Sequence, residues 1–193
     1  MVAMYKYLII ESKKDFQLDQ ALIVSLFSEF ITFSNLVMSS QSLDMFYEHE
    51  TDISFQDVIV NMSSEVLLDL RIFVSLSFST CEERDEHLLQ TKAFLSQIPF
   101  NKYVYLDHRI LLNHFINQIT PHKKAYFLRK YSQDVMMLES LKVYLDSNQN
   151  TVSASKKLYL HRNTLLQRLE KFHQTTGFDL KVFNDAYLIY HLL

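Results

Sequence analysis

Hydrophobic residues in the first 107 positions alternate between the period of a strand and that of a helix. The pattern predicts strands over residues 5–12, 35–41, 43–49, 71–79 and 102–107. The second and third of these strands are joined by a Ser/Gln turn, and the fourth keeps a clean period of two through Ile72, Val74, Leu76 and Phe78. The predicted order is β-α-β-β-α-β-α-β, which is typical of an α/β layer built on one mixed sheet.

Three helices are expected between these strands. The first carries apolar residues at helical spacing, namely Leu18, Leu22, Ile23, Leu26 and Phe30. The second opens at Ser54 with Asp57 and carries Phe55, Ile59, Met62, Val66 and Leu67. The third opens with the capping-box pair Thr80 and Glu83 and is ended by Pro99.

After Asp107 the strand signal stops and the apolar residues keep a helical period. The sequence predicts helices over residues 108–119 and 123–131, separated by Pro121, and an amphipathic helix over 134–146. We therefore expect an α+β chain in which an α/β domain, a helical connector and an all-α domain occupy residues 1–110, 111–133 and 134–193.

The composition excludes several classes of protein. The chain has 193 residues, 48% of them hydrophobic, but a single glycine and two prolines. A Walker A loop, a dinucleotide-binding GxGxxG turn and a protein-kinase glycine loop all need several glycines, because the backbone must approach phosphate closely. None of these loops can be built here.

Cysteine content and hydropathy bear on the compartment. A lone Cys81 allows no internal disulfide, which suits a reducing cytoplasm. No run reaches the roughly 18 apolar residues of a membrane span, and the apolar run YLII near the N-terminus is too short for a signal peptide. We expect a cytoplasmic protein without a membrane partner.

Charge divides the chain into an acidic and a basic part. Residues 1–120 carry 8 Lys/Arg and 16 Asp/Glu, a balance of −8, whereas residues 121–193 carry 11 and 6, a balance of +5. Such asymmetry is typical of a polyanion-binding module fused to an acidic domain. Chance drift in surface charge explains it about equally well, so the interpretation depends on a motif.

The stretch from Asn150 to Gly177 provides that motif. It predicts two helices joined by a tight turn, the first from residue 151 or 152 to about 158 and the second from about 161 to 176. Ala154 is small where the helices of a helix-turn-helix cross closely. The apolar seam between them consists of Val152, Leu158, Leu160, Leu165, Leu169 and Phe172. Gly177 follows the second helix, where a left-handed residue closes a helix, so we predict a positive φ there.

The outward face of the second helix carries side chains of the types that can bind DNA. Arg bonds guanine and Asn or Gln bonds adenine in the major groove, which recognition helices read mainly with their N-terminal residues. The candidate base-reading residues are Arg162, Asn163, Leu166 and Gln167. The candidate phosphate-binding residues are Ser153, Ser155, Lys156, His161, Thr164, Arg168 and Lys171.

The C-terminal part closely resembles the helix-turn-helix of the purine-catabolism and sugar-diacid regulator (PucR/CdaR-type) family. The resemblance covers roughly residues 135–193 and rests above all on HRNTL, then RLE and TG at matching intervals. It implies a bacterial transcription regulator that binds double-stranded DNA, usually as a homodimer on a palindromic operator.

The resemblance also suggests a use for the acidic part. Many members of the family place a degenerate GGDEF-like domain before the helix-turn-helix, and the order β-α-β-β-α-β-α-β is similar to that layout. The hairpin turn at residues 39–42 has neither glycine nor an acidic pair, so we expect a regulatory or dimerisation domain without cyclase activity. Leu166 and Gln167 stand where relatives more often place Arg and Tyr, and Tyr159 occupies a turn where many such motifs prefer glycine.

Other candidate chemistry has ordinary explanations. The spacings of His108, His114 and His122 match no metal site, and we expect surface or core histidines. We find no catalytic set, cofactor motif or metal cluster, and expect a non-enzyme. The competing hypothesis is an adaptor whose helix-turn-helix unit binds another protein, or whose acidic domain binds a small-molecule effector while the helical tail mediates oligomerisation.

Overall fold

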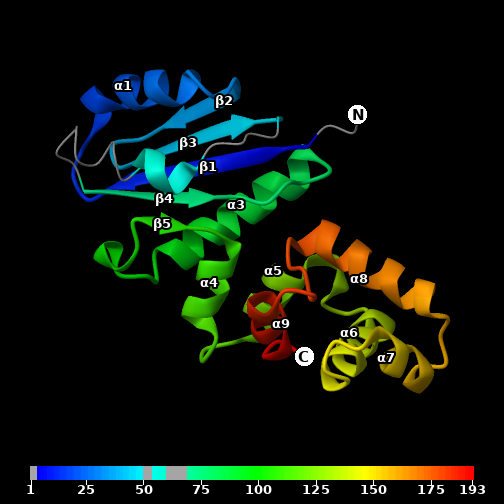
Figure 1. Ribbon diagram of the computed structural model, residues 1–193. Coiled ribbons are helices and arrows are strands. Elements are labelled where there is room, and N and C mark those ends of the chain that lie inside the picture. Colours follow the sequence, from blue (N-terminus) through cyan, green and yellow to red (C-terminus); the bar gives the residue numbers. More distant parts are fainter. Residues whose placement is uncertain (1–3, 50–53, 60–68) are drawn as a thin grey trace. The chain divides into compact units, whose positions relative to one another are not determined.

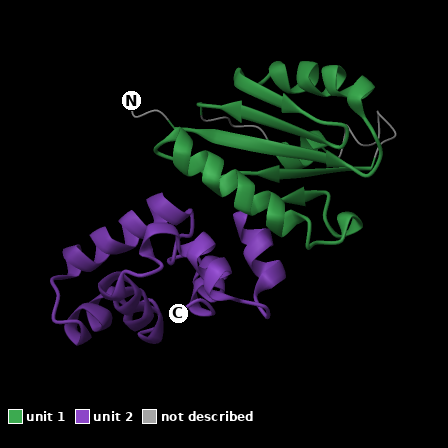
Figure 2. Cartoon of the chain, turned by 180° about the vertical axis from the view of Figure 1, so that it is seen from behind, with its two compact units in different colours: residues 1–107 green, residues 108–193 purple. Residues whose placement is uncertain are grey.

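The computed structural model describes residues 4–49, 54–59 and 69–193. The chain divides into two compact units, residues 1–107 and residues 108–193, which are coloured separately in Figure 2. The first unit combines a sheet with helices, and the described part of the second is helical throughout. The predicted mixed α+β class with a helical C-terminal part is therefore confirmed.

The first unit contains a five-stranded mixed sheet in the order β2-β3-β1-β4-β5 (Figure 1). All neighbouring strands are antiparallel except β4 and β5. β3 lies between β1 and β2, so the unit contains a split β-α-β arrangement. The strands are β1 (Lys6–Ser12), β2 (Phe33–Met38), β3 (Ser42–Tyr47), β4 (Leu70–Val74) and β5 (Tyr105–Leu106).

Alternation along β1 directs its side chains to two different layers. Leu8 and Ile10 join the core formed with α1 (Gln17–Ser28) and the helical residues 55–59. Tyr7 points to the other face, where its hydroxyl lies 2.7 Å from both His87 Nδ1 and Thr91 Oγ1 of α3 (Cys81–Leu95). The two faces of the sheet are thus covered by different helices (Figure 1).

The helices begin where the capping residues predicted, but α1 buries a different set of side chains. Thr80 Oγ1 accepts a hydrogen bond from Glu83 N at 3.2 Å, and Ser54 Oγ accepts one from Asp57 N at 3.3 Å. In α1 the buried residues are Gln20, Ile23 and Phe27. Leu18 is 96% exposed, and Leu22 and Phe30 are also exposed, because α1 turns the 20/23/27 stripe to the sheet. The expected Met62, Val66 and Leu67 lie outside the described residues.

Two predicted strands are shorter in the structure. β4 ends at Val74, and Phe78 rejoins the sheet only through an isolated bridge to Tyr5. β5 has two residues because residues 100–102 form a 3-10 turn. Helix α3 ends at Leu95, before Pro99.

The second unit contains six α-helices and one 3-10 turn among its residues, all of which the structure describes. They are α4 (His108–Phe115), α5 (Pro121–Leu128), η2 (Arg129–Tyr131), α6 (Val135–Asp146), α7 (Thr151–Lys157), α8 (Arg162–Thr176) and α9 (Phe183–Tyr190). Residues 111–133, which we expected to form a connector, belong to this compact unit. α4 packs on α9, and η2 packs on α6 and α8.

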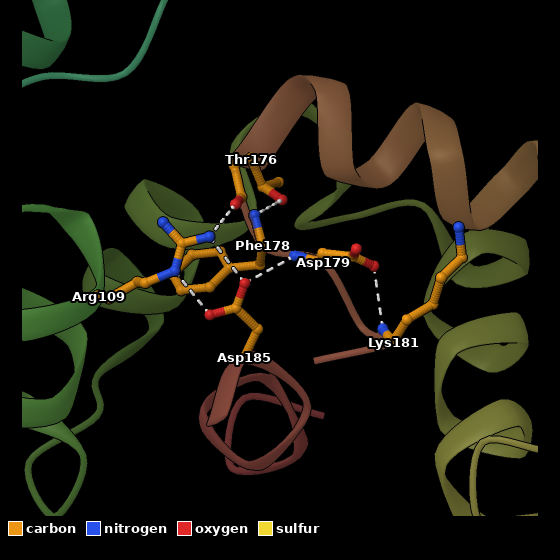
Figure 3. A network of polar contacts seen from close by, with 7 residues as sticks. Arg109, Thr176, Phe178, Asp179, Lys181 and Asp185 are labelled. Carbon is orange, nitrogen blue, oxygen red and sulfur yellow. Dashed lines mark hydrogen bonds and ion pairs between the residues drawn. The ribbon is translucent and has the colours of Figure 1, made fainter. Parts of the chain in front are cut away.

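A buried carboxylate joins α4 to α9 and to the end of α8 (Figure 3). Asp185 Oδ1 accepts a hydrogen bond from Arg109 Nε at 2.7 Å, and Asp185 Oδ2 accepts one from Arg109 Nη2 at 2.8 Å. Asp185 Oδ2 also accepts from the backbone N–H of Asp179 at 2.8 Å. The same Arg109 Nη2 donates to the carbonyl oxygen of Gly177 at 2.7 Å. The first helix of the unit therefore holds the segment that follows α8.

Candidate nucleic-acid interface

Helix α7 begins at a strong cap. The Asn150 side-chain oxygen accepts hydrogen bonds from the backbone N–H groups of Val152 and Ser153, both at 3.0 Å. Two of the otherwise unpaired N–H groups of the first turn are thereby satisfied. Ala154 is fully buried on a helix that packs against α6 and α8, as its small side chain predicted.

The turn between α7 and α8 is built from residues 158–161. Leu160 N donates to Ser155 O at 2.9 Å, and Tyr159 N donates to Lys156 O at 3.2 Å. Tyr159 has φ 54° and its side chain is 97% exposed. His161 ends the turn as the N-cap of α8, where its Nδ1 accepts a hydrogen bond from Asn163 N at 3.2 Å.

One face of α8 forms the seam that the sequence predicted. Leu165, Leu169 and Phe172 are buried, whereas Leu158 and Leu160 are half-buried. Val152 was also expected in the seam but is 49% exposed, because Ala154 and Ser155 are the buried residues of α7. The seam fixes which side of α8 faces solvent.

The candidate base-reading residues lie in the first two turns of α8, with Asn163 and Gln167 on the side opposite the seam. Arg162, Asn163 and Gln167 are exposed, and Leu166 is half-buried. Arg162 Nε donates a hydrogen bond to Thr151 Oγ1 at 3.2 Å, so its guanidinium is held beside the N-terminus of α7. Three polar side chains with the chemistry of base recognition are thus presented to solvent along the N-terminal half of α8.

The seven candidate phosphate-binding residues divide into two groups. Lys156, His161, Thr164 and Lys171 are exposed, and Ser153 is half-buried. Ser155 is buried, and its hydroxyl donates to Val152 O within α7 at 3.1 Å. Arg168 Nη1 donates to Ser140 Oγ of α6 at 2.5 Å. Ser155 and Arg168 therefore make hydrogen bonds within the unit, whereas the other five side chains are the more accessible candidates for phosphate binding.

Two further residues join this surface. Thr151 orients Arg162, and the exposed Lys157 donates from its Nζ to Ser147 Oγ at 3.1 Å. The sequence alone does not indicate this role of Thr151, because its hydrogen-bond partner Arg162 lies eleven positions away. Lys157 follows Lys156 directly and could have been included from the sequence.

The end of α8 has the geometry that the lone glycine predicted. Gly177 has φ 77°, and its N–H bonds to His173 O at 2.7 Å, which confirms a left-handed residue at the helix end. The following segment, residues 178–182, leads into α9. It is held by the hydrogen bond from Asp179 N to Asp185 Oδ2.

The charge imbalance coincides with the two units. Residues 1–107 carry 7 Lys/Arg and 16 Asp/Glu, a balance of −9, whereas residues 108–193 carry 12 and 6, a balance of +6.

Within the described residues, no group of three or more His, Cys, Asp or Glu side chains could hold a metal ion. No helix in the described parts of the chain is long and apolar enough to cross a membrane.

Comparison with known proteins shows what this helical segment is similar to. Residues 137–193 match the PucR C-terminal helix-turn-helix domain. This PucR-type match runs from the first buried residue of α6 through the end of α9 and contains every candidate DNA-binding residue.

Three relatives extend the comparison. The DNA-binding transcriptional activator AdeR of Bacillus subtilis is 31% identical over 61% of this chain and 29% of its own. The purine catabolism regulatory protein of the same organism is 40% identical over 27% of this chain and 10% of its own. The carbohydrate diacid regulator of Escherichia coli is 33% identical over 33% of this chain and 16% of its own. The matched stretches span less than a third of each relative's length.

Proposed function

We propose that this protein is a sequence-specific DNA-binding transcriptional regulator that reads the major groove with α8. The observation that carries the proposal is the two-sided character of α8. Leu165, Leu169 and Phe172 fix one side in the core, Asn163 and Gln167 lie on the opposite side, and Arg162 is exposed at the first position of the helix. The PucR-type match and the regulators named above support the same function.

In this proposal the side chains divide by role. Arg162, Asn163, Leu166 and Gln167 contact base edges, whereas Ser153, Lys156, His161, Thr164 and Lys171 bind the phosphates on either side. The basic balance of the unit adds a sequence-independent attraction for DNA. Specificity then depends on a few polar groups, and much of the affinity depends on charge.

The regulator acts as a homodimer on a palindromic operator, since one short recognition helix contacts few base pairs. A dimer presents two copies of α8 to half-sites about 34 Å apart, one turn of DNA. A duplex with two inverted half-sites should then bind far more tightly than one with a single half-site.

We assign the sheet domain a regulatory or dimerisation role, as a degenerate GGDEF-like domain. The split β-α-β arrangement supports this kinship. The hairpin turn closes on itself, because Ser39 N donates to Ser42 O at 2.8 Å and Ser42 N donates to Ser39 Oγ at 3.0 Å. Such a turn offers no glycine backbone to a nucleotide phosphate, which supports a domain without cyclase activity. In this proposal the domain acts in the cytoplasm on a signal or on a partner copy.

The test is selection of DNA from a random-sequence duplex pool by the full chain, followed by gel-shift titration of the most enriched duplex. We expect an enriched inverted repeat and a retarded complex that weakens steeply with salt. No retarded fragment at low salt would overturn the proposal and favour the adaptor hypothesis.

A further inference from the structure

The turn between α7 and α8 places an aromatic side chain in solvent on a strained backbone. Tyr159 has φ 54°, a region that is costly for any residue with a Cβ and free only for glycine. Its side chain is 97% exposed, so packing within the protein does not compensate for the strain. Residues strained in this way are held by the surrounding structure and cluster at functional sites.

The other described non-glycine residues with positive φ differ from Tyr159. Gln149 donates from its side chain to Leu180 O at 2.5 Å, and the Arg129 side chain bonds the carbonyl oxygen of Thr175. Asn148 belongs to the residue type that tolerates this region best. Each of these three positions has an internal reason for its residue, whereas the Tyr159 ring is directed to solvent.

The position of the turn points to what the ring contacts. Tyr159 lies two residues before the His161 cap of α8, between the exposed Lys156 and Arg162. Its backbone is fixed by the hydrogen bond from Tyr159 N to Lys156 O and by the next one along the chain, from Leu160 N to Ser155 O. When the second helix of such a motif enters the major groove, the first helix crosses the sugar-phosphate backbone, so the turn between α7 and α8 lies beside that backbone.

We infer that Tyr159 is a DNA-contacting residue that donates a hydrogen bond from its hydroxyl to a phosphate oxygen beside the groove. The inference rests on the proposed DNA-binding function and adds a residue that positions α8. A neutral phenol releases no counterion, and a phosphate contact carries no sequence information. Tyr159 therefore raises affinity equally for all sequences and leaves the salt dependence of binding unchanged.

The experiment compares Tyr159→Phe, Tyr159→Gly and wild type on two duplexes, the one most enriched from a random pool and one of scrambled sequence. Tyr159→Phe removes only the hydroxyl, and we expect about tenfold weaker binding to both duplexes, as for a hydrogen bond to a charged group. The slope of log affinity against log salt should not change. Tyr187→Phe, at a partly exposed tyrosine of α9, is the matched control and should bind like wild type.

Tyr159→Gly separates this role from a structural one. Glycine relieves the positive φ, so the variant should unfold at a temperature no lower than wild type and still lose at least as much affinity as Tyr159→Phe. Wild-type affinity for Tyr159→Phe, or an altered preference between the two duplexes, would overturn the inference while leaving the proposed function intact. Failure of the wild-type protein to bind either duplex would overturn both.

Discussion

Arg162 Nε donates a hydrogen bond to Thr151 Oγ1 at 3.2 Å, and the two residues are the first of α8 and α7. The bond therefore joins the N-termini of the two helices that frame the proposed DNA-binding surface. A free arginine side chain loses up to about 2 kcal/mol of rotamer entropy when it is fixed on a base. Holding the guanidinium before DNA arrives lowers this cost.

Removing the acceptor should weaken binding without changing the sequence that is read. For Thr151→Val, which keeps the shape of the side chain, we expect roughly threefold to tenfold lower affinity and an unchanged preferred duplex, by gel-shift titration. Arg162→Ala should cost about 1–3 kcal/mol and relax the preference at one base pair. Thr151→Ser retains the hydroxyl and serves as the control. Wild-type affinity for Thr151→Val would show that the hydrogen bond has no role in binding.

Phosphate-binding and base-reading side chains should differ in how their variants respond to salt. Lys156→Ala should weaken binding to all duplexes and reduce the slope of log affinity against log salt by about 1. Asn163→Ala should leave that slope unchanged and reduce discrimination between the selected and scrambled duplexes by about 1–3 kcal/mol. Lys14→Ala, at an exposed lysine of the first unit, is the control for a general loss of charge. An unchanged slope for Lys156→Ala would remove this lysine from the proposed phosphate set.

Local signals in the sequence predicted much of the second unit. Caps and breaks depend on neighbouring residues, so Asn150, His161 and Gly177 could be placed near helix ends before the structure was known. The apolar spacing of Leu165, Leu169 and Phe172 likewise fixed the buried side of α8. These features depend only on residues within a few consecutive helical turns.

Features that depend on distant partners were not predictable in this way. Ser155 and Arg168 have the residue types of phosphate ligands, but α7 buries the first and Ser140 of α6 binds the second. The exposure of Leu18 depends on how α1 lies on the sheet rather than on its own spacing. Arg109 and Asp185 are 76 positions apart, and no local pattern connects them.

The Arg109–Asp185 pair should be important for the stability of the second unit. The Asp185 side chain is 2% exposed, and its two oxygens accept bonds from Arg109 and from Asp179 N. Asp185→Ala leaves those donors without their acceptor, and we expect a loss of about 3 kcal/mol in the free energy of unfolding, measured with urea on the full chain. Asp179→Ala removes only a side chain that bonds Lys181 N within an exposed turn, and should cost less than about 1 kcal/mol. Equal effects for the two variants would contradict a special role for Asp185.

His108 should make the second unit less stable in acid. It is buried among the rings of Tyr126, Phe127 and Phe178, and this burial, together with the positive charges of Arg129 and Arg109, lowers its pKa from 6.5 to about 3. The His108 side chain therefore takes up a proton near pH 6.5 in the unfolded chain, but only near pH 3 in the folded protein. The contribution of His108 to stability is complete above pH 6.5 and is lost progressively as the pH falls toward 3.

Replacing this histidine with a residue that does not titrate should flatten the pH dependence. Between about pH 6.5 and pH 5, wild type should lose about 1 kcal/mol per pH unit more than His108→Gln, whatever the stability of the variant at neutral pH. Urea unfolding of the full chain, followed by helical circular dichroism at several pH values, measures this difference in slope. His122→Gln removes an exposed histidine and should keep the wild-type slope. If His108→Gln also kept that slope, His108 would have to take up its proton in the folded protein as readily as in the unfolded chain.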